Sequence, residues 1–487
     1  MATKLLDALR EDRPGFTSSQ GGPECYLRGK SRGGCLKPAD RTFAQTTQCQ
    51  QMNAIATLLS MEDSVFIVHA PDGCSGCASM FNESYKVGQY HRGKRVAKNA
   101  HIVSSSFDEN DVIMGGETKL RTTIRSVVQR YQPKIVFLFS SCSSGIIGDD
   151  IDAVAAELQK DYDSTVIIPI HCEGFKSKIH STGFDVVFNA IQNYIIGDDR
   201  PETEEGLVNI FATTSIGYAD QLELERMLKA IGLKVNYIPF FSSYEKLKKI
   251  PAAEYSVSVC QVFADTYMKF LYEEYGIPYV ITGMPVGTRS TDRWLTEIAK
   301  MVGKEEEAAA FLARERAAVL PEIESLREKI QGRRVFVCTG TGRGVAAATL
   351  IEDYNMKLVG IQSPTYEDAY VDDYERLAEF HGDDFIIDVA TMQPFEQVNL
   401  VNRLKPDFFI GIGSWVDKLG IPNTHILEPK RPTFGYRGVV YLGRKIATAL
   451  ENTAWADKMA AHRKLPYRDS WYQQDAFHYM KREEDEE

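Results

Sequence analysis

Three of the nine cysteines in this chain occupy positions that suit a metal–sulfur site. Cys74 follows the apolar run 65–68, and Cys142 follows the apolar run 135–139. Runs of this kind are typical of buried parallel strands, and open α/β sheets bind their ligands at the carboxyl ends of such strands. Cys49 stands among polar residues before a helical run. Thiolates on such turns can converge although they lie far apart in the sequence, so we expect these three to be cluster ligands.

Cys74 and Cys77 also form a CxxC pair, which has other common uses. The spacing can mark a redox pair, two zinc ligands or a chance occurrence. The absence of a second CxxC pair from the sequence disfavours a structural zinc site, while a thioredoxin-type site stays an alternative. Disulfides need an oxidising compartment, and the sequence begins without the apolar segment of a signal peptide. We therefore expect a cytoplasmic protein with reduced thiols.

Three further cysteines stand at the ends of predicted strands, namely Cys172, Cys260 and Cys338. A free cysteine in such a place is most often a small buried apolar side chain, and for each of them that interpretation stands beside a ligand role. Gly342 and Arg343 lie in a glycine-rich turn between a predicted strand and a predicted helix. Free backbone N–H groups and the helix dipole suit an anion there, either a negatively charged cluster or a carboxylate bound to it.

Two histidines are candidate functional residues. His180 follows a basic loop and could donate protons, because imidazole titrates near neutral pH. His425 lies on a short apolar run before a proline, where a histidine is more often part of the core. From the residues alone, a structural role is the alternative for both.

Length and charge restrict the class of protein. The chain has 487 residues and a formal charge of −11, with 44% hydrophobic and 25% charged residues. This composition is typical of a soluble globular protein, and the length suits about three domains. A negative chain lacks the basic face that a nucleic-acid backbone requires, and no stretch approaches the roughly 18 apolar residues of a membrane span. We therefore expect neither nucleic acid nor membrane as a partner.

Short β-branched runs alternate with longer helical patterns from residue 49 onward, which predicts parallel sheets covered by helices on both faces. The predicted strands are 65–69, 134–139, 165–170, 207–212, 233–238, 255–260, 278–282, 334–338, 357–361, 384–388, 407–411 and 423–427. The predicted helices include 218–231, 261–275, 305–330, 343–353 and 395–404.

The predicted fold class is α/β, with three domains that are each a mainly parallel sheet flanked by helices. The predicted parts are an irregular N-terminal arm at 1–48, domain I at 49–203, domain II at 204–331, domain III at 332–455 and a C-terminal tail at 456–487. The three thiols of the cluster site would lie in domain I, and Cys260 in domain II.

Several segments resemble the component 1 subunits of nitrogenase, in the same order along the chain. Residues 67–74 (IVHAPDGC) resemble the HGPxGC turn of that family, and residues 107–116 (FDENDVIMGG) resemble its ENDVIFGG segment. Residues 142–151 (CSSGIIGDDI) resemble CPxGLIGDDI, and residues 172–183 resemble CEGFRGVSQSLG. Shorter matches follow at 273–278, 403–407, 419–422 and 435–438. On these motifs the chain is identified as an α-type member of the nitrogenase component 1 superfamily.

The resemblance implies two iron–sulfur clusters. Cys49, Cys74 and Cys142 match the α-type ligands of an 8Fe–7S P-cluster, which a paralogous β-type subunit would share. Cys260 matches the cysteine that holds one end of a large active-site cluster similar to the FeMo-cofactor. The resemblance leaves open whether that cluster contains Mo, V or only iron, and whether homocitrate accompanies it.

The second ligand of that active-site cluster depends on how the motifs are counted. Counting back from residues 435–438 gives His425, whereas counting forward from residues 420–422 gives Leu427. A two-residue deletion between the motifs reconciles the counts and makes His425 the ligand. Gly342 and Arg343, in the turn that replaces the family's GGLRPRH loop, are the residues we expect beside the cluster's negative charge.

The chain departs from the family around the implied active site. By this resemblance, Phe184 stands at the position where dinitrogen-reducing members carry a proton-donating histidine. His180 stands at a glutamine position of the family, and we take it as the candidate catalytic proton donor. Because dinitrogen reduction needs protons at specific edges of the cluster, these departures disfavour it.

Within the superfamily the chain looks most like methylthio-alkane reductase. That resemblance implies a catalytic subunit that cleaves the C–S bond of small methyl thioethers to methanethiol and a hydrocarbon. The implied partners are a β-type subunit in a heterotetramer, a homodimeric 4Fe–4S reductase that hydrolyses ATP, and the small organosulfur substrate. The alternatives are a scaffold for cofactor assembly, a dinitrogenase α subunit, a tetrapyrrole reductase of the dark protochlorophyllide type and an electron-transfer subunit. Retention of Cys260 and His425 disfavours a scaffold, which should release its cluster.

Overall fold

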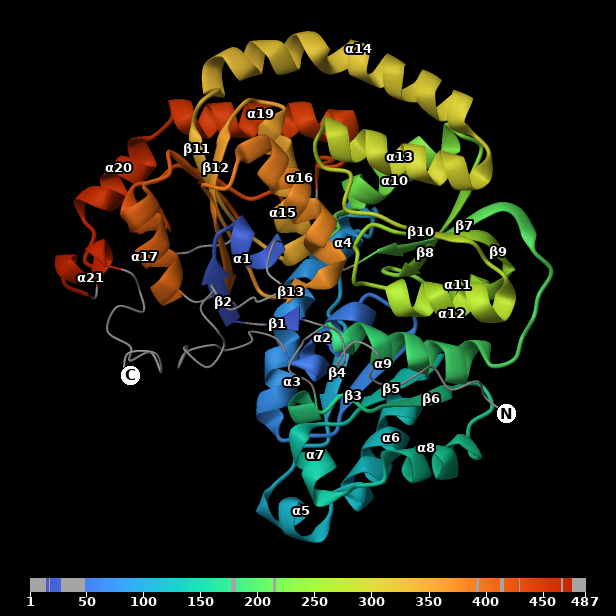
Figure 1. Ribbon diagram of the computed structural model, residues 1–487. Helices are drawn as coiled ribbons and strands as arrows, with labels where there is room; N and C mark the ends of the chain where they lie inside the picture. Colours follow the sequence, from blue (N-terminus) through green and yellow to red (C-terminus); the bar gives the residue numbers. More distant parts are fainter. Residues whose placement is uncertain are drawn as a thin grey trace, which may run out of the picture. The chain divides into compact units, whose positions relative to one another are not determined.

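A computed structural model describes residues 15–16, 18–27, 49–176, 181–212, 216–390, 394–411, 416–428, 430–465 and 467–474 of the protein. The described residues form two compact units (Figure 1). The first takes its residues from 48–218 and 231–282, and the second takes its residues from 13–47, 219–230 and 283–487. Three sheets of mainly parallel strands lie in these units, so the predicted α/β fold class is confirmed. Each sheet falls mainly in one of the three predicted domain ranges.

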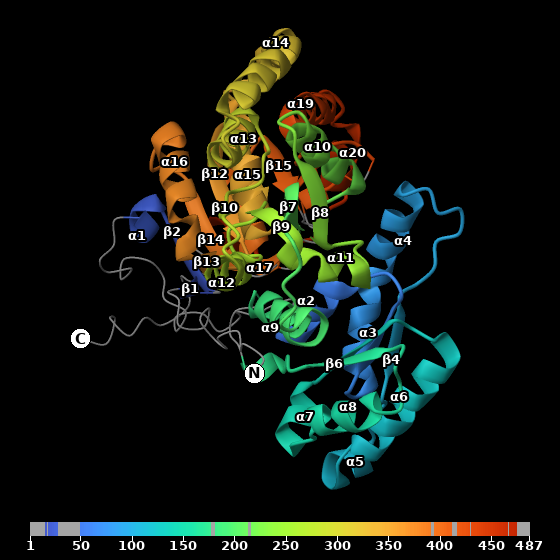
Figure 2. The same ribbon diagram turned by 90° about the vertical axis from the view of Figure 1, so that its right-hand side faces the viewer.

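The first unit contains a four-stranded parallel sheet of order β4-β3-β5-β6. Its strands are β3 (Ser64–Val68), β4 (His101–Ser104), β5 (Ile135–Phe139) and β6 (Val166–Ile170). Every residue of β3 and β5 is buried, because helices cover both faces of the sheet (Figure 2). One face packs against α6 (Glu117–Tyr131) and α8 (Ile151–Gln159), and beyond the other face α2 (Gln50–Leu58) packs on α9 (Thr182–Ile191).

Edge strand β4 has no counterpart among the predicted strands. Its apolar run is only two residues long, and its residues are exposed or half-buried. A short edge strand of this kind does not produce the buried apolar run that revealed β3 and β5. Strand β4 was therefore not predicted from the sequence.

Short helices follow the strands of this sheet at their carboxyl ends. They are α3 (Asp72–Ala78) with α4 (Asn82–His91) after β3, α5 (Glu109–Met114) after β4, and α7 (Cys142–Ile147) after β5. A capping box between Ser141 and Ser144 begins α7, and left-handed Gly148, with φ 81°, ends it. These local signals decide that Cys142 is the first residue of the helix.

The second sheet of the first unit is also parallel, in the order β10-β9-β7-β8. Its strands are β7 (Glu204–Ala212), β8 (Lys234–Pro239), β9 (Ala253–Ser258) and β10 (Tyr279–Ile281). Helices α11 (Tyr244–Lys248) and α12 (Asp265–Tyr275) lie between these strands in the sequence. Helix α10 (Tyr218–Lys229) connects β7 to β8, but from Ala219 onward it belongs to the second unit.

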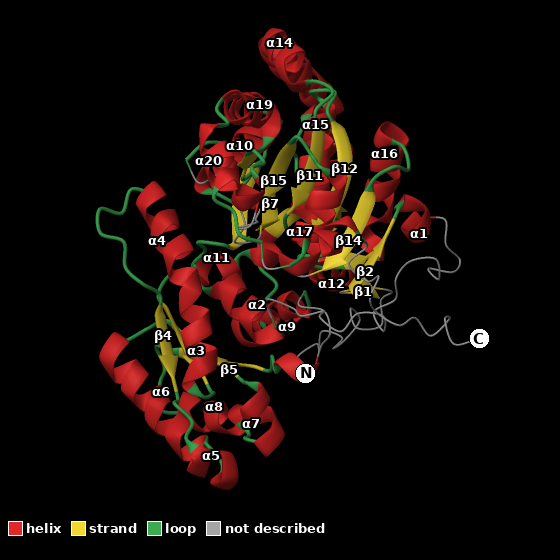
Figure 3. Ribbon diagram, turned by 90° about the vertical axis from the view of Figure 1, so that its left-hand side faces the viewer, coloured by secondary structure: helices red, strands yellow, loops and turns green. Residues whose placement is uncertain are grey.

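The second unit contains a six-stranded sheet of order β16-β15-β11-β12-β14-β2, in which only β2 is antiparallel to its neighbour (Figure 3). Its strands are β2 (Ser18–Gly21), β11 (Arg334–Cys338), β12 (Lys357–Ser363), β14 (Ile386–Ala390), β15 (Phe408–Gly411) and β16 (Asn423–Thr424). The predicted strand 423–427 is thus only two residues long in the structure, and His425 follows it directly.

Part of the predicted irregular arm is ordered in the second unit. The described residues 15–16 and 18–27 contain β1 (Gly15–Phe16), β2 and α1 (Pro23–Leu27), and β1 pairs with β13 (Tyr366–Glu367). On β2, Gln20 Nε2 donates to Asp388 Oδ1 at 3.1 Å. The sequence did not indicate this strand, because a short polar segment is recognised as a strand only through the partner it pairs with.

The helices of the second unit cover its sheet and extend beyond it. They are α13 (Thr288–Val302), α14 (Glu305–Ile330), α15 (Thr341–Glu352), α16 (Val371–His381), α17 (Pro394–Leu404), α18 (Val416–Leu419), α19 (Gly435–Glu451), α20 (Ala454–Ala461) and α21 (Asp469–Gln473). Leu400 and Val401 of α17 pack in an apolar cluster with Phe336 and Phe409 of the sheet. In the part of the chain that the structure describes, no helix is both long and apolar enough to cross a membrane.

Candidate metal centre

Two of the predicted cluster ligands turn their sulfur atoms towards the same point of the first unit. A Cβ atom added to Gly174 would lie 3.4 Å from Cys49 Sγ and 3.4 Å from Cys142 Sγ. The same added atom would lie 2.9 Å from Cys49 Cβ, which is closer than carbon atoms normally approach. The missing side chain of Gly174 therefore leaves room for two thiols from distant parts of the sequence.

Cys74 belongs to the same group of thiols. Burial raises the pKa of its thiol, and the neighbouring Cys49, Cys142 and Cys77 raise it further, because thiolates repel one another. Bound iron would offset this repulsion, since a metal ion stabilises the thiolates that coordinate it. The structure thus brings together Cys49, Cys74 and Cys142, the three cysteines that the sequence singled out.

Each of these three cysteines stands near the start of a helix. Cys49 is the N-cap residue of α2, and its side chain makes no capping hydrogen bond. Cys74 lies in the first turn of α3, and Cys142 is the first residue of α7. Cys142 is exposed, while Cys49 and Cys74 are half-buried. The group of thiols therefore opens at the surface of this chain, where a second polypeptide can add ligands.

The three thiols do not surround a single metal ion. Within the described ranges, no three His, Cys, Asp or Glu side chains are arranged to hold one ion. A structural zinc site requires such a set, so the zinc interpretation of Cys74 and Cys77 gains no support. The ligands of an iron–sulfur cluster bind different iron atoms and lie farther apart. The all-sulfur donors and the space beside Gly174 therefore fit a cluster of several irons.

A buried histidine joins the sequence motifs around these cysteines. His69, in the turn before Cys74, places Nε2 2.9 Å from Asp149 Oδ2 and Nδ1 3.0 Å from Ser105 Oγ. Both carboxylate oxygens of Asp149 accept from the backbone N–H of Gly116, at 3.0 and 3.1 Å. Burial lowers the pKa of His69. One carboxylate thus connects three segments that the sequence showed only as separate motifs.

A buried carboxylate and two half-exposed cations hold the loop that carries Gly174. The side chain of Glu173 is 3% exposed and lies 2.8 Å from Lys176 Nζ and 3.6 Å from His171 Nδ1. Burial opposes the ionisation of Glu173, but His171 and Lys176 bring its pKa down to about 2. The hydrogen bond to Asp152 and the nearby carboxylate of Glu173 raise the pKa of His171 to about 9. These ion pairs keep Gly174 beside the thiols, and they could not be predicted from the charged residues of the motif.

Two other cysteines belong to the core. Cys172 Sγ donates to Ser140 O at 3.4 Å, and burial raises the pKa of its thiol well above the ordinary value. Cys338 Sγ donates to Gln362 Oε1 at 3.1 Å and accepts from Gln397 Nε2 at 3.0 Å, and burial raises its pKa to about 12. Both thiols are protonated at neutral pH, which favours the core interpretation for each.

Cys260 lies in the first unit, just beyond the carboxyl end of β9. It is 7% exposed, and its backbone N–H donates to Ser258 Oγ at 3.1 Å. Ser258 Oγ in turn donates to Cys260 O at 2.7 Å, which closes a tight turn at the end of the strand. Phe263 follows in the same segment and meets the ring of Phe184 edge-to-face at 4.7 Å. Phe184, at the position where the resemblance implies a proton-donating histidine in dinitrogen-reducing members, thus packs against another aromatic ring.

His425 lies in the second unit, directly after β16. It is exposed, and Lys445 Nζ donates to its backbone carbonyl at 3.2 Å. Partial burial and the charge of Lys445 lower the pKa of the imidazole. A neutral imidazole is the form that binds metals. Cys260 and His425 belong to different units.

Gly342 and Arg343 lie in the first turn of α15, and both are buried. The side chain of Arg343 donates to Ile426 O at 3.2 Å, and its guanidinium lies 5.6 Å from the centre of the Phe434 ring. The arginine is thus engaged with the segment that follows His425. The predicted proton donor His180 lies outside the described residues.

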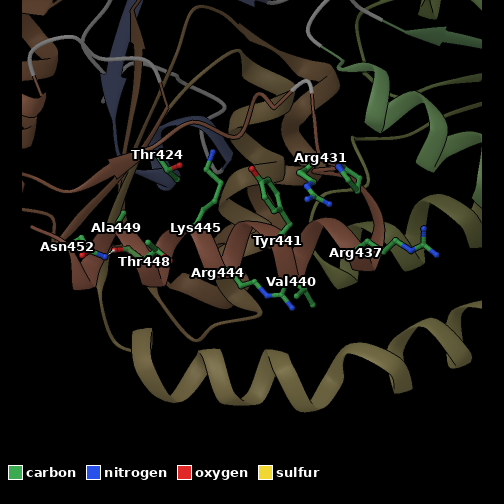
Figure 4. A pocket seen from close by; sticks show the side chains of 11 residues that line it. Thr424, Arg431, Arg437, Val440, Tyr441, Arg444, Lys445, Thr448, Ala449 and Asn452 are labelled. Carbon is green, nitrogen blue, oxygen red and sulfur yellow. Dashed lines mark hydrogen bonds between the residues drawn. The ribbon is translucent and has the colours of Figure 1, made fainter. Parts of the chain in front are cut away.

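A pocket of about 860 Å³ lies along α19 in the second unit (Figure 4). The basic residues that line it are Arg431, Arg437, Arg444 and Lys445. Arg444 forms two hydrogen bonds to Glu322, at 2.5 and 2.8 Å, and Lys445 lies 3.7 Å from Glu428. Carboxylates of the same chain therefore neutralise part of this positive charge. None of the predicted site residues lines the pocket.

Comparison with known proteins agrees with the fold. The profile of the nitrogenase component 1 type oxidoreductases matches residues 49–451, so the chain belongs to this family of oxidoreductases. The chain is 27% identical to the nitrogenase molybdenum-iron protein alpha chain of Methanococcus maripaludis, over 81% of this chain and 84% of that one. It is 28% identical to the corresponding alpha chain of Methanosarcina barkeri, over 65% of this chain and 58% of that one.

A second kind of relative is equally similar. The chain is 27% identical to the nitrogenase iron-molybdenum cofactor biosynthesis protein NifE of Methanococcus maripaludis, over 86% of this chain and 87% of that one. Among solved structures, nitrogenase Cp1 at pH 5 superposes with a TM-score of 0.73 over 89% of this chain and 92% of that one, at 23% identity. The chain is therefore an α-type or NifE-like member of the family, and the structural likeness concerns the fold.

Proposed function

We propose that this chain is the catalytic α-type subunit of a nitrogenase-like reductase. The observation that supports this most is the approach of Cys49 and Cys142 to Gly174, with Cys74 beside them. Three thiols are too few for an 8Fe–7S P-cluster. A β-type subunit would therefore supply the remaining ligands at the surface where Cys142 is exposed. Family membership and the all-sulfur donor set both support an iron–sulfur centre here.

A second cluster would be held by Cys260 and His425. When bound, such clusters supply electrons at low potential. The turn between Ser258 and Cys260 holds the thiol at the end of β9, where α/β proteins place their ligands. His425 would bind through a neutral imidazole, and its lowered pKa supports that role. Loss of both ligands should therefore leave the chain folded but unable to retain the cluster.

An exposed apolar group near Cys142 supports a partner that delivers electrons to the first cluster. Ile113 and Met114, at the end of α5, are 78% and 82% exposed, and Ile146 of α7 is 74% exposed. Apolar side chains gathered at a surface are typical of protein interfaces. Because α7 begins at Cys142, a reductase bound here would stand close to the P-cluster, where a short path favours electron transfer. This partner would be the homodimeric 4Fe–4S protein that hydrolyses ATP.

The substrate we propose is a small methyl thioether. Reduction would add two electrons and two protons to R–S–CH₃, break the bond between R and sulfur, and release R–H and CH₃SH. The aromatic pair of Phe184 and Phe263, the second of which follows Cys260 closely in the sequence, supports an apolar substrate and offers no proton donor of its own. His180 is the residue we propose as proton donor.

A cofactor-assembly scaffold is the second candidate. The observation that favours it is the likeness to NifE, which equals the likeness to the molybdenum-iron protein alpha chain of the same organism in identity, at 27%, and covers slightly more of both chains. A dinitrogenase α subunit is a third candidate, which the likeness to the molybdenum-iron protein alpha chains supports. The scaffold would need a cluster that leaves readily, whereas a catalyst would keep it through many turnovers.

Metal analysis and a substrate screen test the proposal together. The chain would be purified anaerobically with its β-type partner and assayed with the reductase and ATP for methanethiol, using dimethyl sulfide, ethyl methyl sulfide and dinitrogen as substrates. We expect well over about eight iron atoms per αβ pair, and methanethiol from the thioethers. Iron near eight without turnover would support a scaffold, and ammonia from dinitrogen would support a dinitrogenase.

A further inference from the structure

A buried carboxylate holds the segment that leads from His425 to α19. Asp220, on α10 of the second unit, is 1% exposed. Its Oδ1 atom accepts from the backbone N–H groups of Thr433 at 2.5 Å and Phe434 at 3.2 Å. The hydroxyl of Thr433 donates to the same carboxylate at 3.0 and 3.1 Å. Asp220 therefore satisfies three donors at the end of the segment farther from His425.

A buried arginine holds the other end of the same segment. Arg343 is 3% exposed and donates to the carbonyl oxygen of Ile426, the residue next to His425. Its guanidinium also lies 5.6 Å from the centre of the Phe434 ring. The two buried charges attract one another, since Arg343 favours the ionised form of Asp220 against the effect of burial. The segment thus has one charged anchor at each end.

The segment needs such anchors because it has little regular structure of its own. Its described residues between β16 and α19 form no helix or strand. At its far end the chain also lies tight against α19, where a Cβ atom on Gly438 would come within 2.3 Å of the Thr433 carbonyl group. Irregular backbone loses conformational freedom when it is ordered, and strong hydrogen bonds to buried charges offset that cost.

We infer that Asp220 and Arg343 are positioning residues for His425. Asp220 fixes Thr433 and Phe434, Arg343 fixes Ile426, and together they limit the positions that the neighbouring imidazole can reach. This inference rests on the proposed role of His425 as a cluster ligand. It also gives Arg343 a function that differs from the direct anion binding expected from the glycine-rich turn.

Amide hydrogen exchange of the chain purified without iron tests the anchors themselves. Asp220→Asn removes the negative charge and turns an amide group towards the N–H donors. We expect exchange at the Thr433 and Phe434 amides to accelerate about ten- to a hundredfold, as loss of a charge-assisted hydrogen bond implies. Asp373→Asn is the matched control, because Asp373 is also a buried carboxylate of the second unit and pairs with Arg293 and Arg376. In this control variant, hydrogen exchange at the Thr433 and Phe434 amides should match that of the wild type.

Metal retention in the complex tests the role toward His425. In Asp220→Asn, and in the milder Arg343→Lys, we expect at least a threefold loss of the active-site cluster's spectroscopic signal with an unchanged P-cluster signal. Unchanged exchange together with full cluster retention in both variants overturns the inference. A wild-type complex without an active-site cluster refutes the proposed function and the role toward His425, and faster exchange in the variants would then establish the anchors alone.

Discussion

Replacing Gly174 with alanine is the sharpest test of the cysteine site. The new Cβ atom would lie 2.9 Å from Cys49 Cβ and 3.4 Å from the sulfur atoms of Cys49 and Cys142. Carbon atoms normally meet at about 3.5 Å or more, so Cys49 or the loop must move by about 0.6 Å. Metal–ligand distances tolerate only about 0.2 Å, so this displacement is enough to disturb the binding of a cluster.

The same change should leave the chain folded. An added methyl group in a packed place costs about 1–3 kcal/mol, whereas the free energy of unfolding of a domain is about 5–15 kcal/mol. We therefore expect a small loss of stability in the iron-free chain, measured by urea unfolding. In the complex with the β-type partner, we expect at least half of the P-cluster iron and signal to be lost.

Gly76→Ala is the matched control for this experiment. Gly76 lies in α3 between Cys74 and Cys77, and an added Cβ atom would have nothing within 4 Å. Alanine there should stabilise the helix by about 0.5–1 kcal/mol and leave the iron content unchanged. If Gly174→Ala binds as much P-cluster iron as Gly76→Ala, the three thiols do not form the site that we describe.

Three further predictions follow from the same structure. Cys74→Ala should remove the P-cluster signal of the complex, whereas Cys77→Ala should keep it. The reverse result would show that Cys77, and not Cys74, is the ligand. Cys260→Ala should abolish the active-site cluster signal and spare the P-cluster, and loss of neither would refute its role as a ligand. Because the pKa of His171 is raised to about 9 in the folded chain, its ion pairs stabilise fully below pH 6.5 and are lost as the pH rises through 9. The free energy of unfolding of the iron-free chain should therefore fall between pH 6.5 and 9, and His171→Gln should flatten that dependence; equal slopes would contradict it.

The elements that carry the thiols could be predicted because their signals are local. The buried runs before Cys74 and Cys142 consist of β-branched and aromatic residues, and these runs are β3 and β5 in the structure. Helix α14 also has its predicted range, although Pro321 lies inside it. The polar strand β2 and the half-exposed β4 were missed, because neither has an apolar run longer than two residues and both depend on pairing with a neighbour.

The residues that hold the site in place could not be predicted in this way. Gly174 and Asp149 lie in motifs that the sequence showed, and Asp220 lies in none of them, but nothing in the sequence indicated a role for any of the three. Their importance comes from what lies across the fold: two sulfur atoms beside Gly174, three segments joined at Asp149, and the Thr433 turn at Asp220. Likewise, the turn around Arg343 suggested an anion site, and only its partner Ile426 reveals an anchor.

Amino-acid order alone determined the α/β class, the strand ends on which thiols stand, and the family to which the chain belongs. These properties depend on hydrophobic periodicity and on short motifs, both of which can be recognised within short stretches of consecutive residues. The tertiary structure alone decided how the three thiols meet, which of the other cysteines are core residues and which charged side chains hold the loops. Those outcomes depend on contacts between residues that are distant in sequence, and such contacts exist only once the strands have found their order in the sheet.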